Sequence, residues 1–196
     1  MLSVLKPKIE QTLQPVARLL HGVNPNLITS FGLVVPVLFF VFVQQELYIW
    51  ALVALVLTAT DMLDGLVARA QNKVTPFGGF LDSTIDRFSD FVMIVVFGFV
   101  GIVSWPLVLI LVLLTYLISY IRSRTELAAK GKLVANVGIM ERTERLIMLF
   151  LGLTMYAIWP DVAVNGLNIM GITFVALIVL SAVTVAQRVV FAYRHL

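Results

Sequence analysis

The residues that could do chemistry in this chain are mainly its carboxylates. Five of the 11 Asp and Glu residues lie between Asp61 and Asp90. Asp61 and Asp64 are three residues apart, so they share one face of a helix. Asp82 and Asp86 are four residues apart and share a face in the same way. Four converging carboxylates repel one another, and divalent cations relieve that repulsion. Because all the donors are hard oxygens, the pattern predicts a site for Mg²⁺ or Mn²⁺.

A turn between the two pairs has to bring them together, and we expect it at Gly78-Gly79. Asp90 lies one turn beyond Asp86, and we expect it to support the site rather than to bind metal. Gly65 and Ala68 are small enough to let a phosphate or a ligand backbone approach, although small residues also serve close helix packing in membranes. The competing interpretation, solvated carboxylates at helix ends, does not explain why four of them lie on matching faces.

Composition and charge exclude the water-soluble classes of protein. Residues of the AVILMFWYC set make up 60% and charged residues 13% of the 196 residues, against roughly 45–50% and about 25% in soluble proteins. The net charge of +3 is too small to indicate nucleic-acid binding. The absence of Cys excludes disulfides, thiolate catalysis, zinc–thiolate sites and iron–sulfur clusters. We therefore predict an integral membrane protein.

The apolar stretches and the basic residues together predict the topology. Six stretches are long enough to cross about 30 Å of hydrocarbon, and they are 27–45, 47–68, 83–104, 106–122, 145–160 and 167–188. All 14 Lys and Arg residues fall in the two termini and in the second-to-third and fourth-to-fifth connections. The positive-inside rule places these segments in the cytoplasm. We expect an all-α integral membrane protein with six transmembrane helices over 23–196 and both termini cytoplasmic.

Residues 1–22 differ in pattern from the rest of the chain. Apolar side chains recur at helical spacing between Leu2 and Leu20, and Lys6 and Arg18 lie elsewhere around that helix. This pattern predicts an amphipathic helix that lies in the cytoplasmic membrane interface, as a separate juxtamembrane segment. A poorly ordered N-terminal extension is the alternative. In either case, the chain turns from this segment into the first predicted span at Asn24-Pro25-Asn26.

The acidic stretch carries a longer motif. The run is Asp61-x2-Asp64-Gly65-x2-Ala68-Arg69-x8-Gly78-x3-Asp82-x3-Asp86. It is similar to the signature of the CDP-alcohol phosphatidyltransferase family, with every fixed position filled at the family spacing. The resemblance extends to the six-span plan and the interfacial helix, and so to essentially the whole chain. It implies a membrane enzyme that joins the lipid-phosphate part of a CDP-linked lipid to an alcohol and releases CMP.

The resemblance also implies roles for individual residues. Two divalent cations, Mg²⁺ or Mn²⁺, would be held, one by Asp61, Asp64 and Asp82 and the other by Asp61, Asp82 and Asp86. Asp86 would also be the general base that takes the proton from the acceptor hydroxyl. Contacts with the CDP-lipid would come from Asn26, Leu27, Ile28, Thr29, Gly65, Ala68, Arg69, Thr75 and Gly78. A homodimer is a further expectation from the family.

Six basic residues follow the fourth predicted span. The simplest interpretation is a positive-inside loop that attracts anionic lipid. The stretches around them, however, resemble the phosphatidylinositol phosphate synthase branch of the family and its archaeal counterpart, the archaetidylinositol phosphate synthases. In that branch the positions that match Arg122, Arg145 and Arg188 bind the phosphate of inositol phosphate, although bacterial relatives commonly have Lys at the first. The implied substrates are a CDP-linked archaeol or diacylglycerol and myo-inositol 1-phosphate, used at the cytoplasmic face of a prokaryotic cell membrane.

Other functions stay open at this point. Within the family the acceptor could be glycerol 3-phosphate or serine, although the lysine- and threonine-containing stretch usual for glycerol 3-phosphate is not apparent. A polyprenyl-transferring enzyme would be expected to have more spans and two distant Asp motifs. A cation transporter needs carboxylates through the depth of the membrane, whereas these lie near the predicted cytoplasmic ends of their spans. Metal-dependent binding of CMP separates a phosphatidyltransferase from a transporter.

Overall fold

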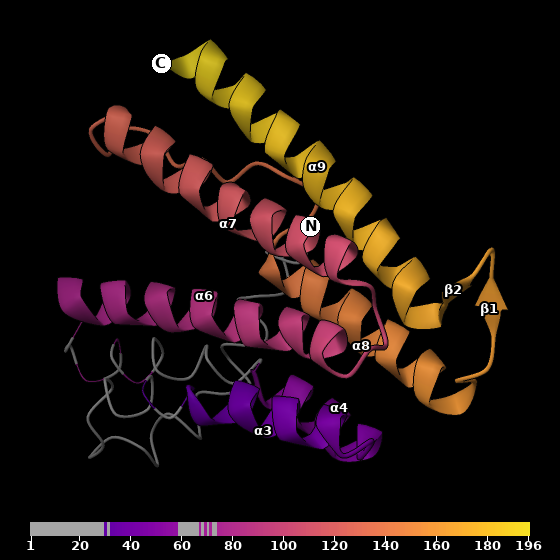
Figure 1. Cartoon of the computed structure of the whole chain (residues 1–196). Helices are drawn as coiled ribbons and strands as arrows, with labels where there is room; N and C mark the ends of the chain where they lie inside the picture. Colours follow the sequence, from indigo (N-terminus) through magenta and orange to yellow (C-terminus); the bar gives the residue numbers. More distant parts are fainter. Residues whose placement is uncertain (1–29, 31, 59–66, 68, 70, 72–73) are drawn as a thin grey trace. The chain divides into compact units, whose positions relative to one another are not determined.

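A computed structural model describes residues 30, 32–58, 67, 69, 71 and 74–196 (Figure 1). In this part the chain forms the helices α3 (Val34–Gln44), α4 (Tyr48–Leu57), α6 (Pro76–Phe99), α7 (Trp105–Ala128), α8 (Arg142–Ile158) and α9 (Ile169–His195), with the short strands β1 (Ala163–Val164) and β2 (Leu167–Asn168). Each helix overlaps one of the six predicted spans. The chain divides into two units between residues 93 and 94, and each is described by itself.

Several predictions lie outside the described residues. They are the interfacial helix in residues 1–22 and the site residues Asn26, Leu27, Ile28, Thr29, Asp61, Asp64, Gly65 and Ala68. The division of the chain into a juxtamembrane segment and a domain over 23–196 therefore stays a prediction.

In the first unit, α3 and α4 form a tight helical hairpin. The chain reverses just after α3, where the backbone N–H of Leu47 donates to the carbonyl of Phe42 at 2.8 Å and Glu46 takes a left-handed conformation with φ 59°. This is the pattern of a helix end in which a residue with positive φ redirects the chain. The rings of Phe42 and Trp50 lie 6.4 Å apart across the turn. The helices bury the apolar side chains Phe39, Val43, Ala51, Ala54 and Leu55.

The beginning of α6 differs from the prediction. Thr75 precedes the helix, and its Oγ1 accepts a hydrogen bond from the N–H of Gly78 at 3.0 Å, which satisfies a donor that has no partner within the first turn. Pro76 occupies the first helical position, where its missing N–H and fixed φ are tolerated. The turn predicted at Gly78-Gly79 is therefore wrong, because both glycines lie inside the first turns of a helix that starts before residue 83.

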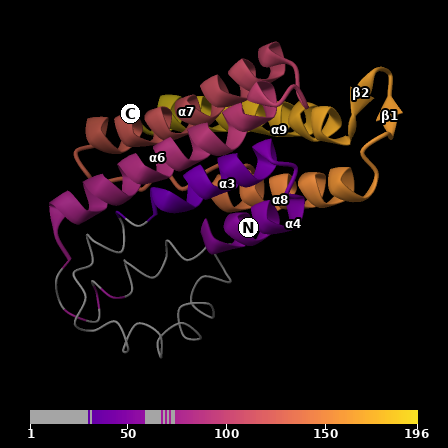
Figure 2. The same cartoon turned by 60° about the horizontal axis from the view of Figure 1, so that its bottom comes forward.

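In the second unit, α7 and α9 lie side by side and run in the same direction (Figures 1 and 2). Contacts near both ends fix this arrangement. Asn168 Nδ2 donates to the carbonyl of Ile102, just before α7, at 2.7 Å. Further along, Arg188 of α9 donates to the carbonyl of Ile118 of α7 at 2.6 Å. Phe97, near the end of α6, also packs against α9, where its ring meets that of Phe174 edge to face with the centroids 5.5 Å apart. Buried apolar side chains fill the seam, namely Val108, Leu111, Ile118, Met170, Phe174 and Leu177.

A two-residue hairpin separates α8 from α9. Ala163 pairs with Asn168 and Val164 with Leu167, and the turn residues Asn165 and Gly166 have φ values of 52° and 77°. Positive φ at both positions is what the right-handed twist of a hairpin requires, and Asn-Gly is its preferred sequence. Asn168 then caps α9 by accepting the N–H of Gly171 at 2.8 Å. The hairpin is a small exception to the predicted all-α class.

A glycine lets α8 approach α9 closely. A Cβ atom at Gly152 would lie 2.5 Å from Thr173 Oγ1 and 2.7 Å from Thr173 Cγ2. The hydroxyl of Thr173 donates within its own helix to the carbonyl of Ile169 at 2.9 Å. The contact between the two helices therefore depends on the small size of Gly152, as is common where helices pack within a membrane.

Two of the helices in the described part, α7 and α9, are long and apolar enough to cross a membrane. Their large apolar side chains are widely exposed, as at Leu109, Leu113 and Val179, which suits contact with lipid tails. The helices α3 and α4 are shorter, at 11 and 10 residues. The count of six spans and the cytoplasmic position of both termini thus remain predictions. Both α7 and α9 continue past the predicted span ends at residues 122 and 188.

Candidate active site

Three carboxylates follow one face of α6. Asp82, Asp86 and Asp90 are spaced by four residues, which returns to nearly the same side of a helix at each turn. Arg87 lies beside two of them, with its Nη2 3.7 Å from Asp86 Oδ2 and its Nε 3.9 Å from Asp90 Oδ2. Its positive charge offsets part of the repulsion between those two carboxylates.

The three carboxylates differ in exposure. The side chain of Asp86 is 19% exposed and that of Asp90 is 1% exposed, while Asp82 is half-buried. A ligand can therefore approach Asp82 and Asp86, whereas Asp90 is enclosed and faces Arg87. This difference favours the predicted supporting role of Asp90.

Two of the four predicted metal ligands lie among the described residues. Asp82 and Asp86 offer hard oxygen donors one turn apart, which suits Mg²⁺ or Mn²⁺. Within the described ranges, no three His, Cys, Asp or Glu side chains gather into a group that could hold a metal ion. The other predicted ligands, Asp61 and Asp64, lie outside those ranges. The residues that are described thus fit the predicted metal chemistry without completing it.

Three of the predicted CDP-lipid contacts are also described. Thr75 and Gly78 are joined at the start of α6 by the capping hydrogen bond. Thr75 is exposed, so its hydroxyl proton can still be donated to a ligand. The positive end of the α6 dipole lies here, and such helix starts favour phosphate groups. Arg69 is exposed as well and belongs to the same unit.

The three predicted phosphate-binding arginines come from three helices of the second unit. Arg122 lies on α7, Arg145 in the first turn of α8 and Arg188 on α9. Arg122 and Arg145 both lie within electrostatic range of Arg188, so the fold brings the three cations into one region. Arg145 is 3% and Arg188 4% exposed. Burying a guanidinium is costly unless its donors find partners.

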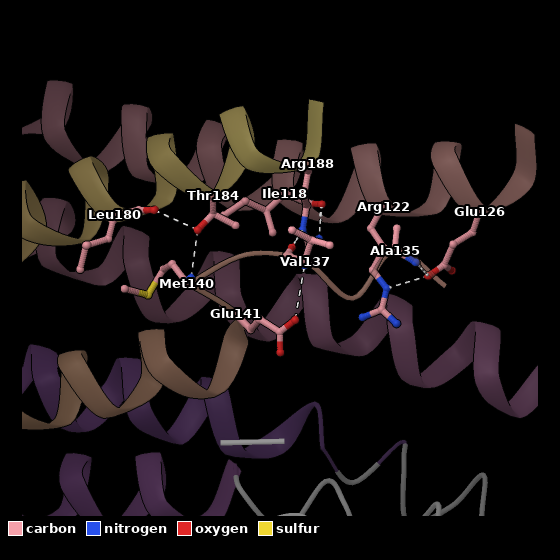
Figure 3. Close-up of polar contacts among 10 residues, drawn as sticks. All are labelled: Ile118, Arg122, Glu126, Ala135, Val137, Met140, Glu141, Leu180, Thr184 and Arg188. Carbon is pink, nitrogen blue, oxygen red and sulfur yellow. Dashed lines mark hydrogen bonds and ion pairs between the residues drawn. The ribbon is translucent and has the colours of Figure 1, made fainter. Parts of the chain in front are cut away.

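Arg188 has three partners, one on α7 and two on the loop that follows α7 (Figure 3). Its Nε donates to the carbonyl of Val137 at 2.8 Å and its Nη1 to the carbonyl of Ile118 at 2.6 Å. Its Nη2 lies 3.6 Å from Glu141 Oε1. The side chain therefore connects α9 to α7 and to the loop that follows α7, in addition to any ligand it binds.

The loop between α7 and α8, residues 129–141, is fixed at further points as well. The backbone N–H of Ala135 donates to Glu126 Oε1 at 3.1 Å, and that of Met140 donates to Thr184 Oγ1 at 2.9 Å. Gly138 has φ 136°, and a Cβ there would lie 2.5 Å from Thr184 Cγ2. This position therefore requires glycine for both its conformation and its contact.

Glu126, Gly138 and Thr184 hold this loop in place, and none of them was predicted from the sequence. Glu126 follows Arg122 by four residues, and such a pair on a predicted helix is a signal of an ion pair. For Thr184 the sequence contains no comparable signal, because its partner Met140 is 44 residues away.

The CDP-alcohol phosphatidyltransferase family matches residues 22–186, and the chain belongs to this family. It is thus an enzyme of phospholipid biosynthesis whose family is membrane-integral, as the sequence predicted.

Similar proteins within the family include named inositol phosphate synthases. The archaetidylinositol phosphate synthase of Pyrococcus horikoshii is 37% identical over 199 residues, which cover 100% of this chain and 98% of that protein. The crystal structure of the phosphatidylinositol phosphate synthase of Mycobacterium tuberculosis with CDP-DAG bound has a TM-score of 0.77 at 27% identity, covering 93% of this chain and 94% of that one. The same enzyme in complex with manganese and citrate also has a TM-score of 0.77, covering 92% and 88%. The predicted family is confirmed.

Proposed function

We propose that this enzyme transfers the lipid phosphate of a CDP-linked lipid to myo-inositol 1-phosphate and releases CMP. The observation that carries the proposal is the gathering of Arg122, Arg145 and Arg188 from three helices of one unit. Guanidinium groups bind phosphate through charge and forked donors. Serine offers them only a carboxylate, and free inositol has no anionic group. The name of the Pyrococcus horikoshii relative supports an inositol phosphate acceptor.

In the proposed reaction, an acceptor hydroxyl oxygen attacks the phosphorus that carries the lipid. The bond between that phosphorus and the oxygen of CMP breaks, and CMP leaves with the electron pair. Asp86 takes the proton of the attacking hydroxyl, for which it must lie within hydrogen-bond reach of the acceptor. Its partial exposure supports this role, and Arg87 beside it restricts where the carboxylate can turn.

The donor would be bound by the motif residues. Asp82 and Asp86, together with Asp61 and Asp64, would hold two divalent cations, Mg²⁺ or Mn²⁺. Bound there, the cations would neutralise the diphosphate and stabilise the attacking and leaving oxygens. The manganese and the CDP-DAG in the Mycobacterium tuberculosis structures support both assignments. The CDP part would contact Arg69, Thr75 and Gly78, with Gly65, Ala68 and the stretch Asn26, Leu27, Ile28 and Thr29 completing the site.

The expected setting is the cytoplasmic face of a prokaryotic cell membrane, where the enzyme would act as a multi-pass homodimer. The distribution of basic residues supports the cytoplasmic placement. Glycerol 3-phosphate is the second candidate acceptor, because the same arginines would bind its phosphate. Serine is the third candidate, because its single carboxylate offers the three arginines less negative charge than a phosphate does.

A CMP-release assay tests this proposal. Purified full-length enzyme is given CDP-archaeol or CDP-diacylglycerol with Mg²⁺ or Mn²⁺, and inositol 1-phosphate, glycerol 3-phosphate, serine and inositol are offered in parallel. Release only with inositol 1-phosphate is expected, and the better donor identifies the lipid. Release with serine alone would overturn the assignment of the arginines. Asp82→Ala is the control, since it should abolish release with every acceptor.

A further inference from the structure

Glu126 joins two parts of the acceptor region through a single oxygen atom. Its Oε1 lies 3.0 Å from Arg122 Nε and 3.1 Å from the backbone nitrogen of Ala135 (Figure 3). Arg122 and Glu126 lie on adjacent turns of α7, and Ala135 is a buried residue of the loop 129–141. The carboxylate therefore connects a predicted phosphate-binding arginine to the loop that separates it from α8.

The contact leaves the outer part of the Arg122 guanidinium available. Glu126 occupies Nε, and in Figure 3 the two terminal nitrogens point away from Glu126. Those nitrogens form the forked pair that binds two phosphate oxygens at once. A long cationic side chain loses rotamer freedom when it binds a ligand, and holding it beforehand reduces that cost.

We propose that Glu126 is a positioning residue for the acceptor, which orients Arg122 toward the phosphate and fixes the loop through Ala135. This inference rests on the proposed function, because it assumes a phosphorylated acceptor that Arg122 contacts. It gives a reason for an acidic side chain beside Arg122, in a region where three arginines gather. A free carboxylate there would repel a phosphate, whereas one that faces Nε and a backbone N–H is turned toward donors.

The other end of the loop offers a matched control. Thr184 Oγ1 accepts the N–H of Met140 at 2.9 Å, and within the described part of the chain no hydrogen bond or ion pair joins Thr184 to Arg122. Thr184→Val keeps the size of the side chain and removes this anchor. A change in acceptor binding that arises only from a loosened loop should therefore follow from either substitution.

The test is a double-mutant cycle on the purified full-length enzyme. KM for inositol 1-phosphate, KM for the CDP-linked lipid and kcat are measured for the wild type, Glu126→Ala, Arg122→Ala and the double variant. Glu126→Ala should raise the acceptor KM about threefold to tenfold, the range of a half-exposed, charge-assisted contact. The donor KM and kcat should stay within about twofold, since Glu126 touches neither the donor nor the reacting atoms. In the Arg122→Ala background the same substitution should add little further effect.

Two further variants separate positioning from a general structural role. Glu126→Gln keeps an oxygen that can accept from Arg122 Nε and Ala135 N, so it should recover most of the affinity. Thr184→Val should leave the acceptor KM within about twofold. An equal rise in Thr184→Val, or effects of Glu126→Ala and Arg122→Ala that multiply independently, would overturn the positioning role.

The outcome is also separable from that of the proposed function. If the wild type does not use inositol 1-phosphate, the proposed function fails, and the cycle is measured with the acceptor that the enzyme does use. A cycle without coupling for that acceptor overturns the role of Glu126. If inositol 1-phosphate is used but Arg122→Ala leaves its KM unchanged, the reaction stands and the role of Glu126 is refuted.

Discussion

Replacing Arg188 with Ala should lower the free energy of unfolding by about 3 kcal/mol, because one guanidinium holds three segments together. The hydrogen bond to Val137 contributes most, since a loop carbonyl loses a charged donor, an effect of about 1.5–3 kcal/mol. The bond to Ile118 contributes less, about 1 kcal/mol, because that carbonyl lies within a helix. Glu141 is partly exposed and lies 3.6 Å away, so its ion pair adds about 0–1 kcal/mol.

Thermal unfolding of the detergent-solubilised enzyme without substrate measures this effect. At roughly 2–4 °C per kcal/mol for a chain of this size, the melting temperature should fall by about 6–12 °C. Arg188→Lys keeps the charge but cannot serve acceptors in three directions, so it should recover less than half of the loss. Thr184→Val, which removes one loop anchor, should cost about 1 kcal/mol and lower the melting temperature by about 2–4 °C.

An Arg188→Ala enzyme that melts at the wild-type temperature but no longer binds the acceptor would refute the predicted role of Arg188 in stability. That result would mean that the guanidinium serves the ligand and is not needed to hold the loop. Full recovery of stability in Arg188→Lys would also contradict it, since the forked geometry would then be unnecessary.

Four other substitutions have distinct expected outcomes. Asp86→Asn should lower kcat by about 10²–10⁴-fold, while CDP-lipid binding stays measurable by equilibrium titration. Equal loss of turnover and of binding would indicate that Asp86 is only a metal ligand and not the general base. Arg145→Ala should raise the acceptor KM by about tenfold or more, because a buried charged donor is lost, and an unchanged KM in the CMP assay would contradict its assignment. Gly79→Ala should raise the free energy of unfolding by about 0.5–1 kcal/mol, as measured by thermal unfolding. A Cβ at this helical position meets no atom of the described residues within 4 Å. Gly78→Ala, at a predicted CDP-lipid contact, should instead raise the donor KM in the same assay series.

The sequence was most informative where a local pattern has one physical meaning. Apolar stretches of sufficient length predicted the position of every described helix, because burial in lipid or protein requires such stretches. The turn predicted at Gly78-Gly79 was wrong because Thr75 and Pro76 form a stronger local signal for a helix start than the two glycines do for a turn. Asn165-Gly166 is likewise a strong local signal, in this case for a hairpin turn, but the hairpin was not predicted.

The site could be predicted only as far as its residues repeat along one helix. Asp82 and Asp86 share a face of α6, as their spacing predicted. The contacts of Arg188 with the loop and with α7 depend on residues 51 and 70 positions away. No periodicity in a single sequence encodes such pairs, because they are created when α7, α9 and the intervening loop pack together.

The close approach of α8 to α9 has an evolutionary consequence. Gly152 and Thr173 share a fixed volume, in which a Cβ at one position would overlap the side chain at the other. Because the Thr173 hydroxyl is satisfied within its own helix, their relation is one of size alone. Substitutions at these two positions should therefore be epistatic, so that a larger residue at 152 survives only in lineages where residue 173 has already become smaller.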